Sequence, residues 1–230
     1  IVVFILSTGP TNKPTYQSQI PTILPNYYLS TTMFKSAALF SLLLAAATAS
    51  PTPSEDLEAR ACAGLGPSVI DVLRVSTPDN ASPGQQFTLS RAGYPPYNTQ
   101  ISAITFNYIP PNATGCMLEI DIPALSQPNQ IAEGATQVDI WTTDPWNYLS
   151  LPTYNSPPKR REMVGTYIFP TQPTTEASKT IIASNTCSDT MSFLVELSNW
   201  QQQSGSVTFY NTLGGKQGIE PTGFKMIYNC

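Results

Sequence analysis

Short runs of alternating apolar and polar residues, separated by proline-rich gaps, constrain the fold of this chain more than any other feature. Alternation with a period of two places successive side chains on opposite faces of a β-strand. The chain contains 22 prolines, and beyond residue 61 they gather between the runs. Proline lacks the backbone N–H that a sheet ladder needs, so a β-fold tolerates it best in such gaps. No segment beyond residue 61 shows a sustained helical period, and we expect an all-β domain.

The pattern predicts nine or ten short strands in one antiparallel β-sandwich, for which a Greek-key connection is an option. A compact β-barrel is the alternative. Within the run 101–108, the side chains of Ile104, Phe106 and Tyr108 fall on one face. The expected strands are 68–75, 86–90, 101–108, 116–122, 136–141, 164–169, 180–184, 192–197, 206–210 and 223–228.

The region before this domain has the composition of a secretory leader. Residues 1–32 contain no methionine, and we interpret them as an upstream or wrongly annotated segment. Residues 33–49 combine a basic start, an apolar stretch and a small-residue cleavage site, which are the parts of a signal peptide. Residues 50–60 are polar and end in arginine, as a short propeptide does. Residues 61–230 then form a single domain of ordinary size.

All four cysteines follow the expected processing site, and an even number in a secreted chain predicts two disulfides. Three pairings are possible. We favour Cys62–Cys230, which joins the ends of the domain, together with Cys116–Cys187, which joins its halves. A zinc site is the rival use of these residues, but the chain has no histidine and no pair of cysteines at zinc-finger spacing.

Charge and composition point to the extracellular space. The formal net charge is −4 and no large basic cluster occurs, so we do not expect a nucleic-acid partner. The mature form has no stretch suited to a membrane.

Asn112 and Asn80 each begin a glycosylation sequon, the second weakened by a following proline. The basic run 159–161 is either a dibasic cleavage site or, as we prefer, a solvated surface segment.

The absence of histidine also narrows the chemistry that the domain could perform. It removes the Ser-His-Asp and Cys-His nucleophile systems and the commonest general base. Carboxylate chemistry remains, as in glycoside hydrolysis. Glu119 and Asp121, two residues apart, and Glu196 all alternate with apolar neighbours, as the solvated face of a strand does. We therefore expect no catalytic residue, no metal site and no cofactor.

Aromatic residues in the long segment between the expected strands 136–141 and 164–169 offer a binding hypothesis instead. Flat rings on loops can stack on the faces of sugars. The competing interpretation is that the rings pack into the sandwich, since large aromatic residues are mostly buried. The candidate ligand-binding residues are Trp141, Trp146, Tyr148 and Tyr154.

Five motifs occur along the domain in a characteristic order: FNYIPPNATGCMLEIDIP at 106–123, VDIW at 138–141, NTC at 185–187, SFLVEL at 192–197 and GFKMIYNC at 223–230. Together they resemble the C-terminal domain family of fungal ubiquitin-3-binding (But two) proteins. The resemblance implies a β-rich, secreted-type fungal domain of poorly defined function without established catalytic residues. The family name implies a link to cytosolic ubiquitin-like conjugation, which a signal peptide and four cysteines oppose in this chain.

These features together predict a secreted fungal glycoprotein that acts in the cell wall or extracellular space without catalysis. Its expected partners are a cell-wall polysaccharide or another extracellular protein. Two other functions stay open from the sequence. One is a carboxylate-dependent glycan hydrolase, and the other is a secreted effector or antigen.

Overall fold

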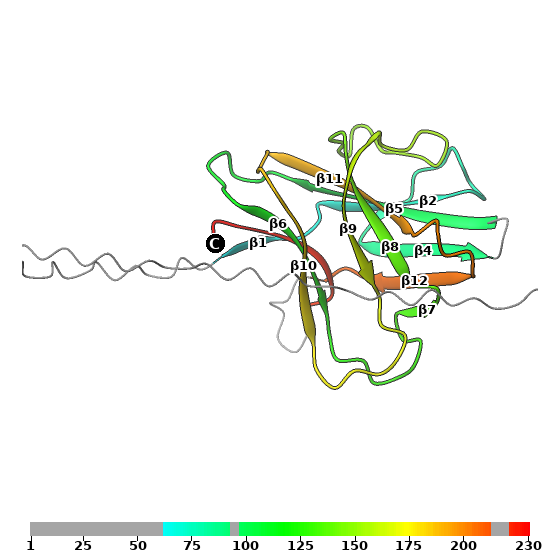
Figure 1. Cartoon of the computed structure of the whole chain (residues 1–230). Helices are drawn as coiled ribbons and strands as arrows, with labels where there is room; N and C mark the ends of the chain where they lie inside the picture. The colour runs from blue at the N-terminus through cyan, green and yellow to red at the C-terminus, as the bar shows by residue number, and fades with distance from the viewer. Residues whose placement is uncertain (1–61, 93–96, 213–220) are drawn as a thin grey trace, which may run out of the picture. The chain divides into compact units, whose positions relative to one another are not determined.

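The computed structural model describes residues 62–92, 97–212 and 221–230. The expected upstream segment, signal peptide and propeptide lie outside the described residues. The described residues form thirteen β-strands and no helix, so none of their elements is a helix that could span a membrane. Every strand pairing is antiparallel, in two sheets (Figure 1).

The smaller sheet has four strands in the order β1-β13-β6-β10. They are β1 (Ala63–Leu65), β13 (Gly223–Tyr228), β6 (Cys116–Ile122) and β10 (Ser178–Asn185). The larger sheet has nine strands, seven of them in the order β7-β12-β4-β5-β11-β8-β9, with β2 pairing with β5 and β3 pairing with β2. They are β7 (Ala132–Gly134), β12 (Gly205–Tyr210), β4 (Gln86–Ala92), β5 (Tyr97–Asn107), β11 (Thr190–Leu197), β8 (Gln137–Thr143), β9 (Arg160–Ile168), β2 (Val69–Arg74) and β3 (Pro83–Gly84).

All ten segments that the alternation marks as strands are strands in the structure. The expectation missed β1, β3 and β7, which contain only two or three residues each and therefore carry no recognisable period. The all-β class and the antiparallel pairing are confirmed.

The main core lies between the two sheets, as expected of a sandwich and not of a single closed barrel. The inward residues of β6 and β13 in the smaller sheet pack in one buried cluster with those of β4, β5, β11 and β12 in the larger one. Aromatic rings join the layers, because the Phe87 ring of β4 lies 5.0 Å from the Phe224 ring of β13. The same Phe87 ring stacks at 4.9 Å on Phe209 of β12.

Four expected side-chain positions are wrong, and one of them is that of Glu196, which was expected on a solvated face but is 7% exposed. Tyr108 does not share the buried face of Phe106 but is 90% exposed, because β5 ends at Asn107 and Tyr108 turns the chain with a φ of 66°. Glu119 and Asp121 do not face solvent either, being 9% and 3% exposed. Their buried position depends on a charged neighbour, described below.

A second, smaller core covers the outer face of the larger sheet. The long segment 144–159 arches over β2 and β5 (Figure 1) and inserts the Trp146 side chain among apolar residues of β2, β5 and β11. These residues are Val69, Leu73, Ile101, Ala103 and Leu194. Hydrophobic burial on both faces explains why β2 is apolar with little alternation, and why β11 is buried at every residue after its first.

Two disulfides connect the cysteines in the pairing favoured from the sequence. Cys62 bonds to Cys230 at a Cα–Cα distance of 4.3 Å, and Cys116 bonds to Cys187 at 5.1 Å. No described cysteine is free. The first bond closes the end of the domain beside the β1–β13 pair, and the second joins the start of β6 to the segment that follows β10.

Candidate functional site

The four aromatic residues predicted to bind a ligand lie around the second core and not in one exposed row. Trp146 is only 6% exposed, and Trp141 and Tyr154 are partly buried against the same cluster. Tyr148 is 57% exposed, and its hydroxyl donates a hydrogen bond of 2.9 Å to the Ser68 carbonyl. The rings mainly fasten the 144–159 segment to the sheet, and Tyr154 also lines a depression beside it.

This depression, which we call the outer-face cleft, has a volume of about 390 Å³. It opens on the outer face of the larger sheet, between the 144–159 segment and the ends of β5, β9 and β11. Its lining includes Arg91, Gln100, Tyr154, Arg160, Glu196 and Asn199. The volume lies in the ordinary range for small-molecule pockets.

An ion pair forms one wall of the outer-face cleft. The Arg160 guanidinium lies 2.6 Å from a carboxylate oxygen of Glu196, whose side chain is 9% exposed. The same guanidinium lies 5.7 Å from the Trp141 ring centre, within the range of a cation–π contact. Arg160 is therefore held between a carboxylate and an indole.

Burial raises the pKa of Glu196 above its ordinary value, even though the charge and hydrogen bond of Arg160 lower it. Asp139 raises this pKa further, because the two acids stand directly opposite each other on β11 and β8. Like charges in such a pair repel each other. Asp139 is bound in turn by the Ser198 hydroxyl.

Sequence reasoning gave Glu196 no role beyond strand alternation and treated Arg160 as part of a surface run. Their contact follows from the pairing of β8 with both β9 and β11, which brings residues 36 apart in sequence together. No local signal in the sequence specifies that register.

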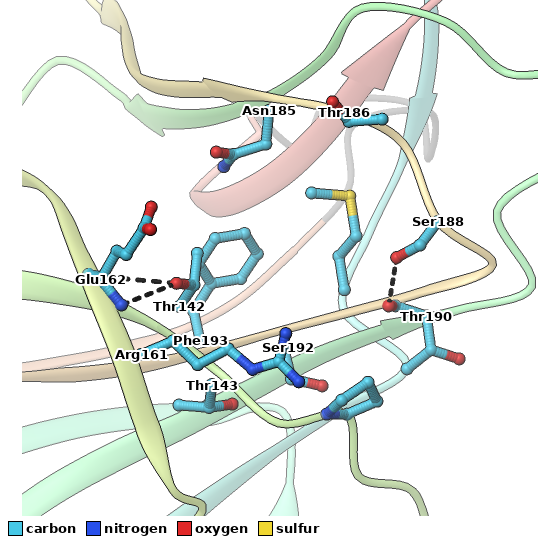
Figure 2. Close-up of a pocket in the computed structure, with 12 residues that line it drawn as sticks. Thr142, Thr143, Arg161, Glu162, Asn185, Thr186, Ser188, Thr190, Ser192 and Phe193 are labelled. Atoms are coloured by element: carbon cyan, nitrogen blue, oxygen red, sulfur yellow. Dashed lines mark hydrogen bonds between the residues drawn. The ribbon is translucent and has the colours of Figure 1, made fainter.

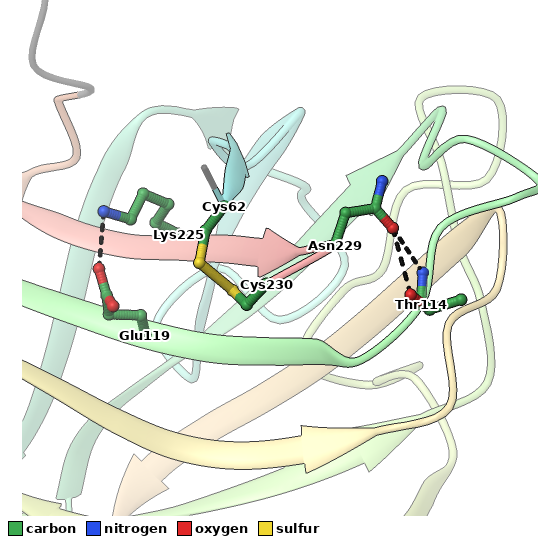
Figure 3. Close-up of a disulfide and its surroundings, with 6 residues drawn as sticks. All are labelled: Cys62, Thr114, Glu119, Lys225, Asn229 and Cys230. Carbon is green, nitrogen blue, oxygen red and sulfur yellow. Dashed lines mark hydrogen bonds and ion pairs between the residues drawn. A yellow bond between two sulfur atoms is a disulfide. The ribbon is translucent and has the colours of Figure 1, made fainter. Parts of the chain in front are cut away.

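The acid pair on β6 forms a different arrangement. Glu119 and Asp121 both bind the Lys225 ammonium, at 2.6 Å and 3.1 Å, and Figure 3 shows the Glu119 contact. Lys225 stands opposite Glu119 on the neighbouring strand β13. Burial lowers the pKa of Lys225, but the hydrogen bonds and charges of the two acids more than compensate and raise it. One ammonium thus accounts for the buried position of both carboxylates.

A second cavity of about 360 Å³ lies where the edge strands of the two sheets meet (Figure 2). Its lining is rich in hydroxyl groups. Glu162 of β9 and Asn185 of β10 extend toward each other across it, and the Asn185 amide nitrogen is buried without a hydrogen-bond partner. The Thr142 hydroxyl is 3.2 Å from both the backbone nitrogen and the backbone oxygen of Glu162. None of the predicted aromatic residues lines this cavity.

The basic run 159–161 is held in the sheet. Arg161 binds Asp144 at 2.6 Å, and the Asp144 backbone N–H donates to the Lys159 carbonyl. Arg160 and Arg161 are the first residues of β9, which pairs with β8. A processing protease needs an extended, accessible segment, so cleavage here would first require β9 to leave the sheet.

In the described parts of the chain, no group of three or more Cys, Asp or Glu side chains is placed to hold a metal ion. Comparison with known families finds no family model that matches this chain. Comparison with curated proteins finds no match either.

Proposed function

We propose that this chain is a secreted, non-catalytic binding domain of the cell wall or extracellular space, and that its outer-face cleft binds a glycan. One observation carries the proposal. Tyr154 lines the same cleft as two side-chain amides, Gln100 and Asn199, and the Glu196–Arg160 ion pair. Aromatic rings stack on the apolar faces of sugars, while amide and guanidinium groups supply the hydrogen bonds that hydroxyl groups need.

The contacts of the charged groups that line the cleft favour a neutral ligand. Arg160 and Glu196 neutralise each other across 2.6 Å. The third charged group of the lining, Arg91, donates to the Ser198 and Gln203 carbonyls and is only 7% exposed.

Arg160 remains a donor through the nitrogen atoms outside its bond to Glu196, whereas the second Glu196 oxygen is buried. A sugar hydroxyl can accept a hydrogen bond from Arg160 and donate one to the amide oxygen of Gln100 or Asn199.

Binding fits the arrangement of the acids better than hydrolysis does. Most glycosidases use two carboxyl groups about 5–9.5 Å apart on either side of the scissile bond. Glu196 is the carboxylate that lines the outer-face cleft, and it is paired with Arg160. Glu119 and Asp121 share the Lys225 ammonium on one sheet face. These contacts support a domain that holds a glycan without cleaving it.

We also propose that the chain belongs among the secreted-type fungal domains that its motifs resemble. Two long-range disulfides support an oxidising compartment. The leader expected at 33–49 would deliver the domain there.

A pull-down of the secreted protein with chitin, β-glucan and mannan tests this function. We expect retention on at least one polymer, and roughly tenfold weaker retention for Gln100→Ala, which corresponds to the loss of about 1.4 kcal/mol. Tyr154→Phe should retain binding because it keeps the ring. Trp146→Ala is unsuitable, because this buried ring supports the second core.

Glu162→Gln provides the matched control, since Glu162 lines the separate cavity of Figure 2. It should bind like the unmodified protein. A loss of binding in Glu162→Gln alone would contradict the assignment to the outer-face cleft. Failure to bind any of the three polymers would overturn the glycan proposal.

A further inference from the structure

Two sequons lie in exposed turns of the domain, and their hydroxyl residues make different contacts. Asn112-Ala113-Thr114 precedes β6, and Asn80-Ala81-Ser82 precedes β3. Both asparagines are exposed. A glycosyl transferase also reads the hydroxyl residue two positions later, so the surroundings of Thr114 and Ser82 decide whether each folded sequon can be used.

Thr114 is bound to the carboxyl-terminal end of the chain (Figure 3). Asn229 Oδ1 accepts hydrogen bonds from the Thr114 backbone N–H at 2.9 Å and from the Thr114 hydroxyl at 3.4 Å. The Asn229 backbone N–H donates to the Thr114 carbonyl at 2.8 Å. Three hydrogen bonds therefore join residues that are 115 positions apart.

Asn229 can reach Thr114 only when the end of the chain is in place. It precedes Cys230, which is bonded to Cys62, and it follows β13, which pairs with β1 and β6. Synthesis proceeds from the amino terminus, so Asn112 enters the secretory compartment long before Asn229 does. The Asn112 sequon therefore passes through a stage in which the Thr114 hydroxyl is free.

Ser82 is held by residues that precede it in the chain. Its backbone N–H donates to Asp71 Oδ1 at 2.7 Å, and its hydroxyl accepts from the Arg74 guanidinium. These partners lie only 11 and 8 positions away, so the contacts require no later part of the chain. Pro83 follows directly and begins β3, and proline after the hydroxyl residue weakens a sequon further.

We propose that Asn112 is an N-glycosylation site that stays open only until Asn229 docks on Thr114, and that Asn80 stays unmodified. The donor would be an oligosaccharide carried on a polyprenyl diphosphate. The Asn112 side-chain nitrogen attacks C1 of the first sugar, the C1–O bond breaks, and the lipid diphosphate leaves with the electron pair. The nitrogen loses one proton. The inference rests on the secretion included in the proposed function, but not on glycan binding.

The first test is the occupancy of each sequon, measured by peptide mass spectrometry on the full chain secreted from eukaryotic cells. We expect a glycan on Asn112 and none on Asn80. Occupied Asn80 beside empty Asn112 would overturn the proposal.

The second test measures glycan transfer to the folded, oxidised, unglycosylated protein by microsomal transferase with its lipid-linked donor. We expect Asn229→Gly to accept a glycan on Asn112 at least tenfold faster than the unmodified chain. Glycine suits this position because Asn229 has a φ of 59°. Equal transfer to both proteins would overturn the proposal that Asn229 closes the Asn112 sequon.

Two variants control this assay. Thr114→Ser keeps the hydroxyl and should remain an acceptor in the Asn229→Gly background, whereas Thr114→Val should abolish transfer. Disulfide mapping of each variant verifies that the domain has folded. The assay supplies the transferase directly, so it tests the closing of the sequon by Asn229 even if the chain is not secreted in cells. Its result is also independent of binding to wall polymers.

Discussion

One buried carboxyl group, Asp71, is unfavourable in its charged form. Asp71 is fully buried on β2, and its Oδ1 accepts a hydrogen bond from the Ser82 N–H. Burial raises the pKa of Asp71 above its ordinary value, and it outweighs the opposing effects of the Ser82 N–H and the Arg74 charge. Its Oδ2 is buried without a hydrogen-bond partner. The charged form of this residue is therefore costly in the folded state.

We predict that Asp71→Asn makes stability less dependent on pH. Because the folded-state pKa is raised, the contribution of Asp71 to stability is greatest below the unfolded pKa of about 3.9, and it is lost as the pH rises through the folded pKa. The variant cannot lose that proton. Between about pH 4 and neutrality, the free energy of unfolding of the variant should therefore increase relative to that of the unmodified protein. Urea denaturation at several pH values measures this difference.

Asp189→Asn is the control for this prediction, since Asp189 lies on the surface between β10 and β11. Its pH profile should run parallel to that of the unmodified protein. Parallel profiles for Asp71→Asn as well would contradict the predicted cost of the Asp71 charge.

At the scale of elements, the two sheets approach each other most closely where β9 and β10 meet. Gly165 of β9 makes this possible, because a Cβ atom there would lie 2.7 Å from the Ile182 Cγ2 and 2.9 Å from the Ile182 carbonyl oxygen. A backbone oxygen cannot move aside as the end of a side chain can. Side chains also face each other across this junction, since Ser178 and Thr180 of β10 lower the pKa of Tyr167 on β9, although burial raises it overall.

We predict that Gly165→Ala destabilises the domain by about 1–3 kcal/mol, the usual cost of an overpacked contact. The midpoint of urea denaturation measures the effect. Gly64→Ala is the matched control, because its nearest neighbour would be a flexible Lys225 carbon at 3.4 Å. That variant should be neutral or slightly more stable, since alanine has less freedom in the unfolded chain. Equal midpoints for the two variants would contradict the close approach of β9 and β10.

At the scale of the domain, two disulfides close loops of very different length. Cys62–Cys230 spans 168 residues and Cys116–Cys187 spans 71. In the chain-entropy model the longer loop is worth only about 0.8 kcal/mol more. Burial instead increases the contribution of the Cys116–Cys187 disulfide to stability. Cys116 is fully buried in the main core, whereas Cys62 and Cys230 are exposed.

We predict that replacing both Cys116 and Cys187 by alanine costs more stability than replacing Cys62 and Cys230, with both costs in the range of about 2–5 kcal/mol. The lost packing of the buried cysteine should exceed the small difference in loop entropy. Urea denaturation under non-reducing conditions compares the two. A larger cost for Cys62 and Cys230 would mean that loop length outweighs burial here.

Much of the fold could be predicted because its signals are local. Alternation located every strand longer than three residues, since a side chain's face depends only on its position along its own strand. The sequence could not decide whether the aromatic rings near the 144–159 segment are exposed or buried, because the same residues are compatible with a loop surface and with a core. The Glu196–Arg160 pair was missed, because it depends on which strands are neighbours.

The sequence by itself determined the β-class of this domain and the positions of its strands, because backbone period and proline placement are properties of adjacent residues. Its four cysteines predicted two disulfides, and three pairings stayed formally open until the strands were placed. Only the tertiary structure decided that Lys225 binds both Glu119 and Asp121, that Arg160 meets Glu196, and that Asn229 closes on Thr114. These contacts join segments far apart in the chain, and strand order and register, which no local pattern specifies, bring them together.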